Sequence, residues 1–414
     1  MPTTRSVTFR DYAPGQTRYP IRIVTPDDGY YIHTFFDVKP WSPSGRYLAC
    51  LKLPFQDRLP GPDDEAIVCI IDLQEQTLTE VAPTKGWGMQ VGAHLCWGSE
   101  EHLYYNDKEG QDVFAVQYNR ATGESRKMAG PVYQVTPDGR KLLSPSLSII
   151  NHAQNGYGAT IDDRYDTMPR LGAPDDEGLW CTDVETNNRT LLFSLRQAWE
   201  LLPDREPFRD ARFTFFHTKI NAQQDRIMQV VRCLFDDKRD ELKFIVTMDM
   251  DGGNPHIALP YELWLKGSHH PDWHPDGRRI LMNIKMNEMR FCLFDQDGSR
   301  FRITCPQVKG GGHPSVSPNG GYIVTDAYTQ ESFANERHEV PIRLVEAETG
   351  KEEAICYIWT LGGTNLPAHL RCDPHPVWSG DGRYVCFNGT PSGSRQILIA
   401  DLGGLNTGNG GIDR

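Results

Sequence analysis

Histidine recurs at one position of a repeated phrase in this 414-residue chain. The phrase places an apolar or aromatic anchor residue before a tight turn, as in SHHPDWHPDGR, GHPSVSPNGG and DPHPVWSGDGR. Three residues before the anchor stand His94, His217, His270, His313 and His375. Neutral imidazoles serve as metal ligands and as general bases. Five of them at one structural address therefore predict a shared site.

Three of these histidines, His270, His313 and His375, belong to the last three copies of the phrase. Imidazoles that converge from neighbouring copies are a common metal site, so we predict a divalent metal ion here. Cys372 and Asp373 lie three and two residues before His375, and either could complete the shell. Strand alternation favours Asp373, whereas a thiolate makes a tighter tetrahedral zinc site. Since the proline before His375 disturbs the alternation, Cys372 is our predicted ligand, alongside the three histidines.

The repeated phrase itself predicts the fold. Each copy has its anchor, and most then have a turn such as SPSGR, TPDGR, HPDGR, SPNGG or SGDGR before an alternating apolar strand. Asp-Gly or Asn-Gly supplies the positive φ that a tight turn between antiparallel strands requires. The anchors of the seven copies, one of which is degenerate, are Trp41, Trp97, Val135, Ile220, Trp273, Val316 and Trp378.

A further strand pair follows each copy, as in AIVCIIDLQEQTLTEV and IRLVEAETGKEEAICY. Seven such modules predict an all-β chain, a seven-bladed β-propeller of four-stranded antiparallel blades that forms a single domain over residues 1–414. A pair of β-sandwiches is the alternative, although it does not predict repeats at this phase. Because innermost strands line the central channel of a propeller, the histidines are expected to form a ring there.

The spacing between anchors is uneven, so the extra residues must leave the blades as loops. We predict the largest insertion at about 148–212, a segment rich in charged and turn residues that contains one helical stretch, LLFSLRQAWELLPD. Long loops on a rigid scaffold commonly shape a binding mouth. Arg164 and Arg170 lie in this insertion, and Arg232 and Arg371 fall on or near other expected mouth segments.

The chain is acidic, with a formal net charge of −12. No run of Lys or Arg is long enough to follow a phosphate backbone, so nucleic acid is not an expected partner. The N-terminal residues lack the apolar core of a signal peptide, and no segment approaches the roughly 20 apolar residues of a membrane helix. As given, the chain is expected to be cytoplasmic, or secreted or periplasmic if a signal peptide was removed. Most of the ten cysteines lie in predicted strands and are expected to be buried thiols.

The phrases SHHPDW, GHPSVSPNG and HPVWSGDGRYVCF, in this order, resemble the metal-bearing blades of oligogalacturonate lyases. Those enzymes are seven-bladed propellers that cleave short uronate oligosaccharides by β-elimination with manganese. The resemblance implies that His270 is the base and that His313 and His375 bind the ion, which makes manganese the alternative to zinc. The family has further His and Gln ligands at places that here hold Asp373 and Leu370.

A second resemblance covers the first half of the chain. The segments GAHLCW, PVYQVTPDGRKLLSPS and NGYGA are similar to propellers that include ulvan lyases and rhamnose-glucuronate lyases. In those enzymes a His and a Tyr on neighbouring blades carry the elimination together with an Arg, while a Cys/His zinc site is structural. The resemblance implies that His94 and Tyr157 are catalytic, with Arg170 or Arg164 as the arginine.

β-Elimination at a uronate needs a positive partner for the carboxylate, a base for the proton at C5 and an acid for the leaving oxygen. An arginine or a metal supplies the first, and histidine and tyrosine supply the others. We therefore expect a polysaccharide lyase that acts on an anionic oligosaccharide, with His94 and Tyr157 favoured for the chemistry and His217, Arg232 and Arg371 binding the substrate. An α-L-rhamnosidase-type hydrolase and a non-catalytic binding propeller are the alternatives.

Overall fold

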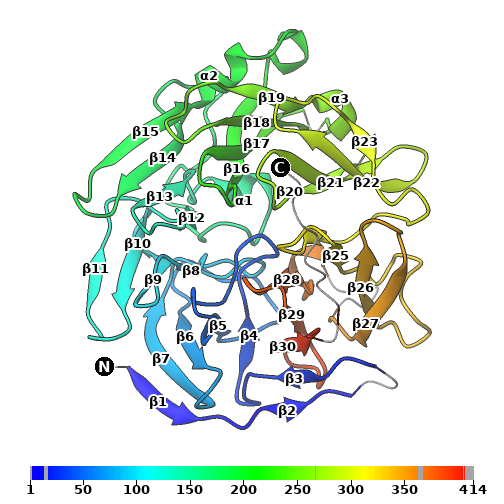
Figure 1. The fold of residues 1–414 in the computed structure, drawn as a ribbon. Coiled ribbons are helices and arrows are strands. Elements are labelled where there is room, and N and C mark those ends of the chain that lie inside the picture. Colours follow the sequence, from blue (N-terminus) through cyan, green and yellow to red (C-terminus); the bar gives the residue numbers. More distant parts are fainter. Residues whose placement is uncertain are drawn as a thin grey trace.

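Seven antiparallel sheets radiate from a central axis in the computed structural model of this chain (Figure 1). The structure describes residues 2–13, 17–237, 239–265, 267–361, 367–403 and 405. Five sheets have four strands, and the first and last blades each carry a fifth strand on the outside. This architecture confirms the predicted all-β, seven-bladed propeller.

The first four blades follow the chain, each from its innermost strand outward. The first contains β4 (Tyr30–Ile32), β5 (Tyr47–Leu53), β6 (Ala66–Asp72), β7 (Thr77–Thr84) and the N-terminal β1 (Thr3–Ser6). The second contains β8 (Cys96–Trp97), β9 (His102–Glu109), β10 (Asp112–Asn119) and β11 (Ser125–Lys127). The third contains β12 (Gln134–Val135), β13 (Lys141–Ser144), β14 (Gly178–Asp183) and β15 (Arg189–Ser194). The fourth contains β16 (Arg212–Ile220), β17 (Arg226–Leu234), β18 (Leu242–Asp249) and β19 (His256–Leu259).

The remaining three blades complete the ring. The fifth contains β20 (His269–Trp273), β21 (Arg279–Lys285), β22 (Met289–Asp295) and β23 (Arg302–Ile303). The sixth contains β24 (Ser315–Val316), β25 (Tyr322–Thr325), β26 (Val340–Glu346) and β27 (Glu352–Ile358). The seventh contains β28 (Val377–Trp378), β29 (Tyr384–Gly389), β30 (Gln396–Asp401), β3 (Ile21–Ile23) and β2 (Arg10–Asp11). Short helices lie in the connections: α1 (Ile150–Ala153), α2 (Leu195–Glu200), η1 (Glu206–Phe208), α3 (Tyr261–Trp264) and η2 (Ala368–Leu370).

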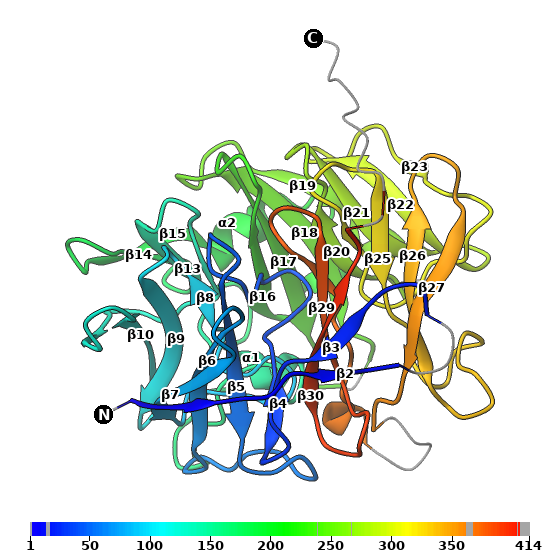
Figure 2. The same ribbon diagram turned by 60° about the horizontal axis from the view of Figure 1, so that its bottom comes forward.

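Strands from opposite ends of the sequence close the ring. In the seventh blade Ile23 pairs with Leu398 across β3 and β30, and the Val24 N–H donates to the Ile397 carbonyl at 3.0 Å. Figures 1 and 2 both show β2 and β3 beside β30. Backbone hydrogen bonds between an N-terminal strand and a C-terminal strand within the seventh blade therefore close the ring.

The anchor residues of the repeat tie neighbouring blades together at the axis. From the second blade onward each anchor ends an innermost strand, and the degenerate copy at Ile220 ends β16 in the same way. In three copies the indole N–H donates to a carbonyl of the preceding blade: Trp97 to Pro40 at 2.9 Å, Trp273 to Lys219 at 3.1 Å and Trp378 to Ser315 at 3.1 Å. Tryptophan therefore recurs at this position because the same hydrogen bond between neighbouring blades recurs.

The segment predicted as one insertion at 148–212 is divided in the structure. Strands β14 and β15 of the third blade run through it, leaving a long connection at 145–177 and a shorter one at 195–211. The predicted insertion is therefore not one continuous loop, because the alternating strand pair inside it belongs to the third blade. The predicted helical stretch contains α2, which Ser194 and Gln197 begin with reciprocal capping hydrogen bonds, but its first residues belong to β15.

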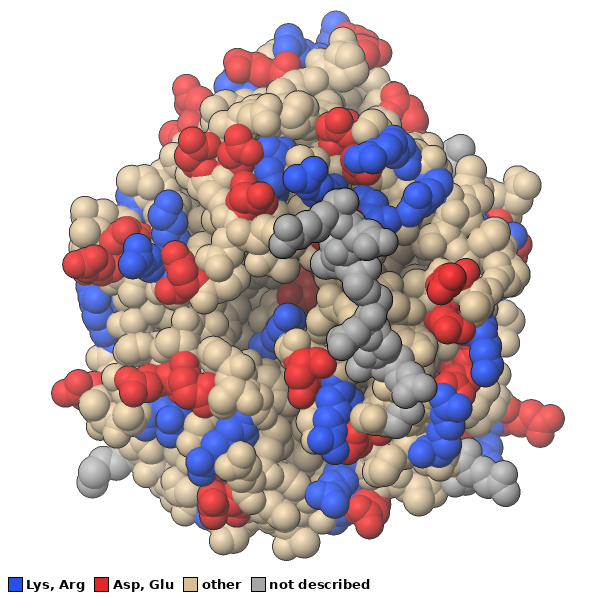
Figure 3. All heavy atoms as spheres, viewed as in Figure 1, with Lys and Arg blue, Asp and Glu red and all other residues tan. Residues whose placement is uncertain are grey.

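Charges of both signs cover the face that Figure 3 shows, with Lys and Arg interspersed among Asp and Glu. All ten cysteines are buried free thiols. Among the described residues, no helix is long and apolar enough to cross a membrane.

Candidate functional site

Four of the five channel histidines occupy irregular backbone in or just before their innermost strands. In β16, Phe216 and His217 together oppose one residue of β17, and in β20, His270 and the next residue together oppose one residue of β21. Such β-bulges re-aim side chains. His94, His270 and His375 also share a left-handed backbone, with φ of 52°, 57° and 48°. Four of the five histidines at the common sequence position thus have a locally distorted backbone at the axis.

Phe35 fills the centre of this ring. Its ring centroid lies 5.2 Å from that of His217, 5.6 Å from that of His313 and 4.5 Å from that of His375. Phe35 begins a tight turn in which the Val38 N–H donates to its carbonyl at 3.1 Å. The aromatic segment DDGYYIHTFFD, which includes Phe35, thus supplies buried core at the axis.

Three potential metal ligands converge in the last two blades. One ligand atom from each of His313, Asp373 and His375 lies within 4.8 Å of the others, and all three residues are buried. The Nε2 atom of His313 and both ring nitrogens of His375 have no hydrogen-bond partner among the described residues. Buried polar atoms normally have partners, so unsatisfied nitrogens that converge on a carboxylate fit a bound cation.

Cys372 was also a predicted ligand, but the group found among the described residues does not include it. It is 1% exposed, and burial raises the pKa of its thiol to about 11, which keeps the sulfur protonated at neutral pH. Asp373 is present instead, and Arg371 donates to its two carboxylate oxygens at 3.0 Å each. The geometry thus favours the carboxylate over the thiol as the third ligand.

His270 lies against the metal group but is oriented by different contacts. Its ring stacks on His313 with 3.9 Å between centroids. Its Nδ1 atom lies 2.6 Å from the Gly312 carbonyl oxygen, which can only accept, so Nδ1 carries the proton and Nε2 carries the lone pair. Burial lowers the pKa of His270 well below its usual range, so the ring is neutral near pH 7.

The other side of the ring holds a separate polar cluster. Tyr133 and His217 are hydrogen-bonded through the tyrosine hydroxyl and Nδ1. His94 is 3% exposed and packs on Tyr133 at 4.5 Å, with its Nε2 atom 3.5 Å from the Tyr157 carbonyl oxygen. Burial lowers the pKa of His94 to about 4. His94 thus contacts Tyr133 and the Tyr157 backbone rather than the three potential ligands.

Tyr157 and Tyr328 lie near the Arg371–Asp373 ion pair. Burial is the main cause that raises the pKa of both tyrosines, and the Asp373 charge adds to it. The Arg371 guanidinium lies 4.7 Å from the centre of the Tyr328 ring. Burial acts to lower the pKa of Arg371, but Asp373 outweighs it and the pKa is raised. Both hydroxyls therefore stay protonated beside a permanent positive charge.

Arg232 is largely occupied by structural contacts. Its guanidinium donates to the Ala153 carbonyl and to Gln154 Oε1, both at 2.7 Å, and stacks over Phe216 at 3.9 Å. The residue is 7% exposed. Arg232 thus fixes the end of α1 beside the channel.

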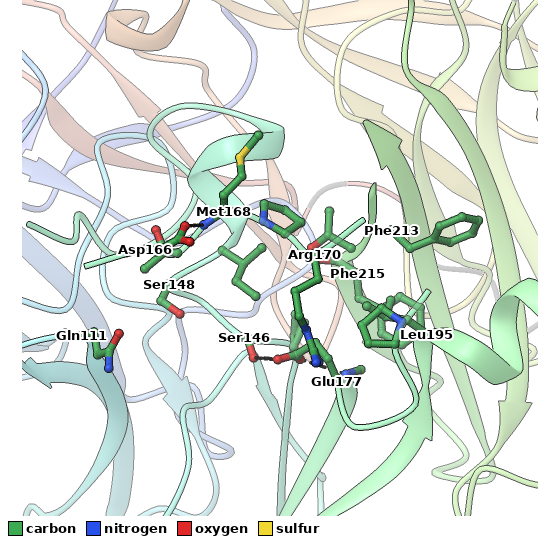
Figure 4. Close-up of a pocket in the computed structure, with 17 residues that line it drawn as sticks. Gln111, Ser146, Ser148, Asp166, Met168, Arg170, Glu177, Leu195, Phe213 and Phe215 are labelled. Carbon is green, nitrogen blue, oxygen red and sulfur yellow. Dashed lines mark hydrogen bonds between the residues drawn. The ribbon is translucent and has the colours of Figure 1, made fainter. Parts of the chain in front are cut away.

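Arg170 lies in a pocket that the channel histidines do not line. Figure 4 shows it near Glu177 and Ser146 in a cavity of about 240 Å³ between the 145–177 connection and β16. Its guanidinium pairs with Asp176, and its side chain is 59% exposed. Arg164 is also exposed and pairs with Asp162 at 3.4 Å. The structure therefore does not bring either arginine to the channel histidines.

Two residues next to the site were absent from the sequence-based candidates. Asp326 directly follows β25 and contacts His313, and Tyr328 follows two residues later with its ring 5.8 Å from that of His313. A carboxylate at the end of the apolar run YIVT was the available signal. That signal was weak because one Asp after a strand is common in turns.

Comparison with known proteins shows where this fold recurs. No family model matches the chain. The structure closely matches an oligogalacturonate lyase in complex with manganese, with a TM-score of 0.66 and 14% identity over 97% of both chains. An oligogalacturonate lyase from Vibrio parahaemolyticus gives 0.65 and 14% over 96% of this chain and 98% of its own. An uncharacterized protein of Agrobacterium fabrum is 28% identical over 146 residues, which span 35% of this chain and about half (46%) of that protein.

Proposed function

We propose that this protein is a divalent-metal-dependent lyase that cleaves uronate-containing oligosaccharides by β-elimination. The observation that carries the proposal is the buried group of His313, Asp373 and His375, with unsatisfied ring nitrogens, beside the neutral imidazole of His270. The likeness in fold to oligogalacturonate lyases, one of them in complex with manganese, supports it.

His313, Asp373 and His375 would hold the ion through two imidazole nitrogens and one carboxylate. This donor set is suited to manganese or zinc. When bound, the ion would withdraw negative charge from the substrate carboxylate and make the neighbouring C5 proton more acidic. Arg371 donates to both carboxylate oxygens of Asp373, which fixes the orientation of this ligand before an ion binds.

His270 is the proposed base. Its Nδ1 proton is held by the Gly312 carbonyl, so Nε2 is the nitrogen that accepts the C5 proton. The residue is partly exposed, in contrast to His313 and His375. Its lowered pKa keeps it unprotonated below the usual titration range of histidine.

Tyr157 and Arg371 are proposed to complete the reaction. The raised pKa of Tyr157 keeps its hydroxyl protonated, so this group can donate to the leaving glycosidic oxygen. The partly exposed Arg371 side chain, 23% exposed, keeps donor capacity beyond its two bonds to Asp373 and can bind an anionic sugar.

The first experiment measures the ultraviolet band of the conjugated uronate while the protein is incubated with oligogalacturonate, ulvan and rhamnose-capped glucuronate glycans. A rise on one substrate that a chelator abolishes and manganese restores is the expected result. A flat trace on all three, with released sugar detected separately, would instead favour a hydrolase. A flat trace without released sugar would favour a binding propeller.

His270→Asn and His94→Asn form a matched pair for assigning the base. Both positions have the same left-handed backbone, which asparagine tolerates. We expect His270→Asn to lower turnover by about 10²–10⁴-fold, the range of a lost general base, and His94→Asn to retain turnover. The reverse result would assign the chemistry to His94 and remove His270 from the proposal.

A further inference from the structure

We propose that Asp326 is a positioning residue that presets the metal site by fixing the tautomer of His313 and the spacing between His313 and His375. The inference rests on the proposed function, since it concerns how the same ligand group is held. Asp326 does not belong to the three potential ligands.

Asp326 is 1% exposed and accepts hydrogen bonds from both histidines. The backbone N–H of His313 donates to its Oδ1 atom at 2.7 Å, and the Nδ1 atom of His313 lies 2.9 Å from Oδ1 and 3.0 Å from Oδ2. The backbone N–H of His375 donates to Oδ2 at 3.1 Å. One buried carboxylate thus holds two metal-ligand residues from neighbouring blades.

These contacts determine which nitrogen of His313 can bind a cation. An ionised carboxylate only accepts hydrogen bonds, so the Nδ1 atom of His313 must carry the proton. The lone pair is then on Nε2, which is the buried nitrogen that has no partner among the described residues. A hydrogen-bonded carboxylate behind a ligating imidazole commonly fixes its tautomer and orientation in this way.

The bond to His375 gives Asp326 a second effect. His313 and His375 are on separate blades, and their ring centroids are 4.4 Å apart. Because Asp326 accepts from the backbone of both residues, it fixes the approach of one blade to the other at the level of the site. This spacing determines whether both rings can reach one ion.

Gly312 shows that the packing around Asp326 is tight. It has φ of 64°, and a Cβ added there would lie 2.1 Å from the Asp326 backbone oxygen and 2.4 Å from its Oδ1 atom. The Gly312 carbonyl is also the acceptor for His270 Nδ1. A single turn therefore orients the proposed base on one side and leaves room for the positioning carboxylate on the other.

The first measurement needs no substitution. Nitrogen NMR of histidine-labelled, metal-free protein should show His313 as the Nδ1–H tautomer near neutral pH, with assignment from a His313→Asn spectrum. The Nε2–H tautomer in the folded protein would overturn the proposal. This readout is independent of turnover, so it stays informative if the protein is not a lyase.

The second measurement compares manganese binding by the full chain and by Asp326→Asn, using the electron paramagnetic resonance signal of the free ion. The carboxylate accepts from three donors, the backbone N–H and Nδ1 of His313 and the backbone N–H of His375. The asparagine amide has only one acceptor oxygen and cannot satisfy all three. We therefore expect the affinity for manganese to fall about 10–100-fold. The His313 tautomer should become mixed in the variant. At saturating manganese, turnover should recover in part, because Asp326 is proposed to act through His313 and His375.

Asp276→Asn is the matched control. Asp276 also contacts a histidine nitrogen, the Nδ1 atom of His274 at 3.2 Å, but on a turn away from the ligand group. Its substitution should leave manganese affinity unchanged. Wild-type affinity in Asp326→Asn would overturn the proposal, as would an equal loss of affinity in both variants. If manganese binds as expected but no unsaturated uronate forms from any substrate, the proposed function fails and the role of Asp326 in metal binding stands.

Discussion

Tyr133 and Tyr157 are both buried tyrosines of the channel, yet their hydroxyl groups have different surroundings. The Tyr133 hydroxyl is engaged by His217. Among the described residues, the Tyr157 hydroxyl has no hydrogen-bond partner, and burial is the main cause that raises its pKa, with the Asp373 charge adding to it. This difference supports Tyr157 rather than Tyr133 as the proposed proton donor.

Tyr157→Phe should lower kcat by about 10²–10⁴-fold while leaving manganese affinity unchanged, because it removes the proposed proton donor and no ligand. Tyr133→Phe is the control: it leaves the Nδ1 atom of His217 without its hydrogen-bond partner, which should cost about 1–3 kcal/mol of stability and spare kcat. Steady-state kinetics and urea unfolding of both variants make the comparison. Equal loss of kcat in the two variants would argue against Tyr157 as the acid.

The segment from His33 to Val38, which ends in the turn that Phe35 begins, closes the centre of the propeller. Phe35 and Phe36 are each 1% exposed, and Phe36 lies 5.4 Å from His313 and 5.7 Å from His270. Aromatic side chains thus support the histidine ring on the side facing the axis. The inner strands hold the histidines from outside, and this turn holds them from within.

Phe35→Ala should lower stability by about 3–5 kcal/mol, as expected for a cavity left by a buried aromatic ring. It should also weaken manganese binding, because Phe35 contacts both His313 and His375. Phe114→Ala, in the core of the second blade, provides a control with a similar loss of packing and no contact with the site. Thermal unfolding and manganese titration of both variants test this, and unchanged affinity in Phe35→Ala would contradict it.

At the scale of the whole molecule, closure of the ring keeps several histidines neutral inside the protein. The pKa of His94 is about 4 because burial disfavours the charged ring. A histidine in the unfolded chain has a pKa near 6.5. Between about pH 4 and pH 6.5, His94 is therefore protonated in the unfolded chain but not in the folded protein. The contribution of His94 to the free energy of unfolding is therefore fully present above about pH 6.5 and is lost as the pH falls toward about 4.

The free energy of unfolding should decrease on acidification from about pH 6.5 to about pH 4, with His94 alone contributing about 3 kcal/mol. Urea unfolding at several pH values, with chelator present, measures the slope. In His94→Asn the slope should be smaller, since asparagine does not titrate. A slope identical to that of the wild-type protein would show that His94 is not a source of the acid sensitivity.

Much of the fold followed from local patterns in the sequence. The anchor residues, the glycine turns and the alternating strand pairs are determined by neighbours within one blade, so each copy could be recognised separately. The regular spacing of the repeat also placed His270, His313 and His375 at equivalent positions of their blades. Closure of the last blade by β3 did not follow, because nothing local in Ile21–Ile23 specifies β30 as its partner.

The sequence by itself determined that this chain is a seven-bladed propeller with histidines gathered at its axis, because repeats encode the same local interactions seven times. Tertiary structure decided which groups meet there. It placed Asp373 rather than Cys372 with the two histidines, left Arg170 in another pocket, and brought Asp326 within hydrogen-bonding distance of a backbone 49 positions away. These contacts depend on how separate blades pack against one another, and no spacing within a single blade specifies them.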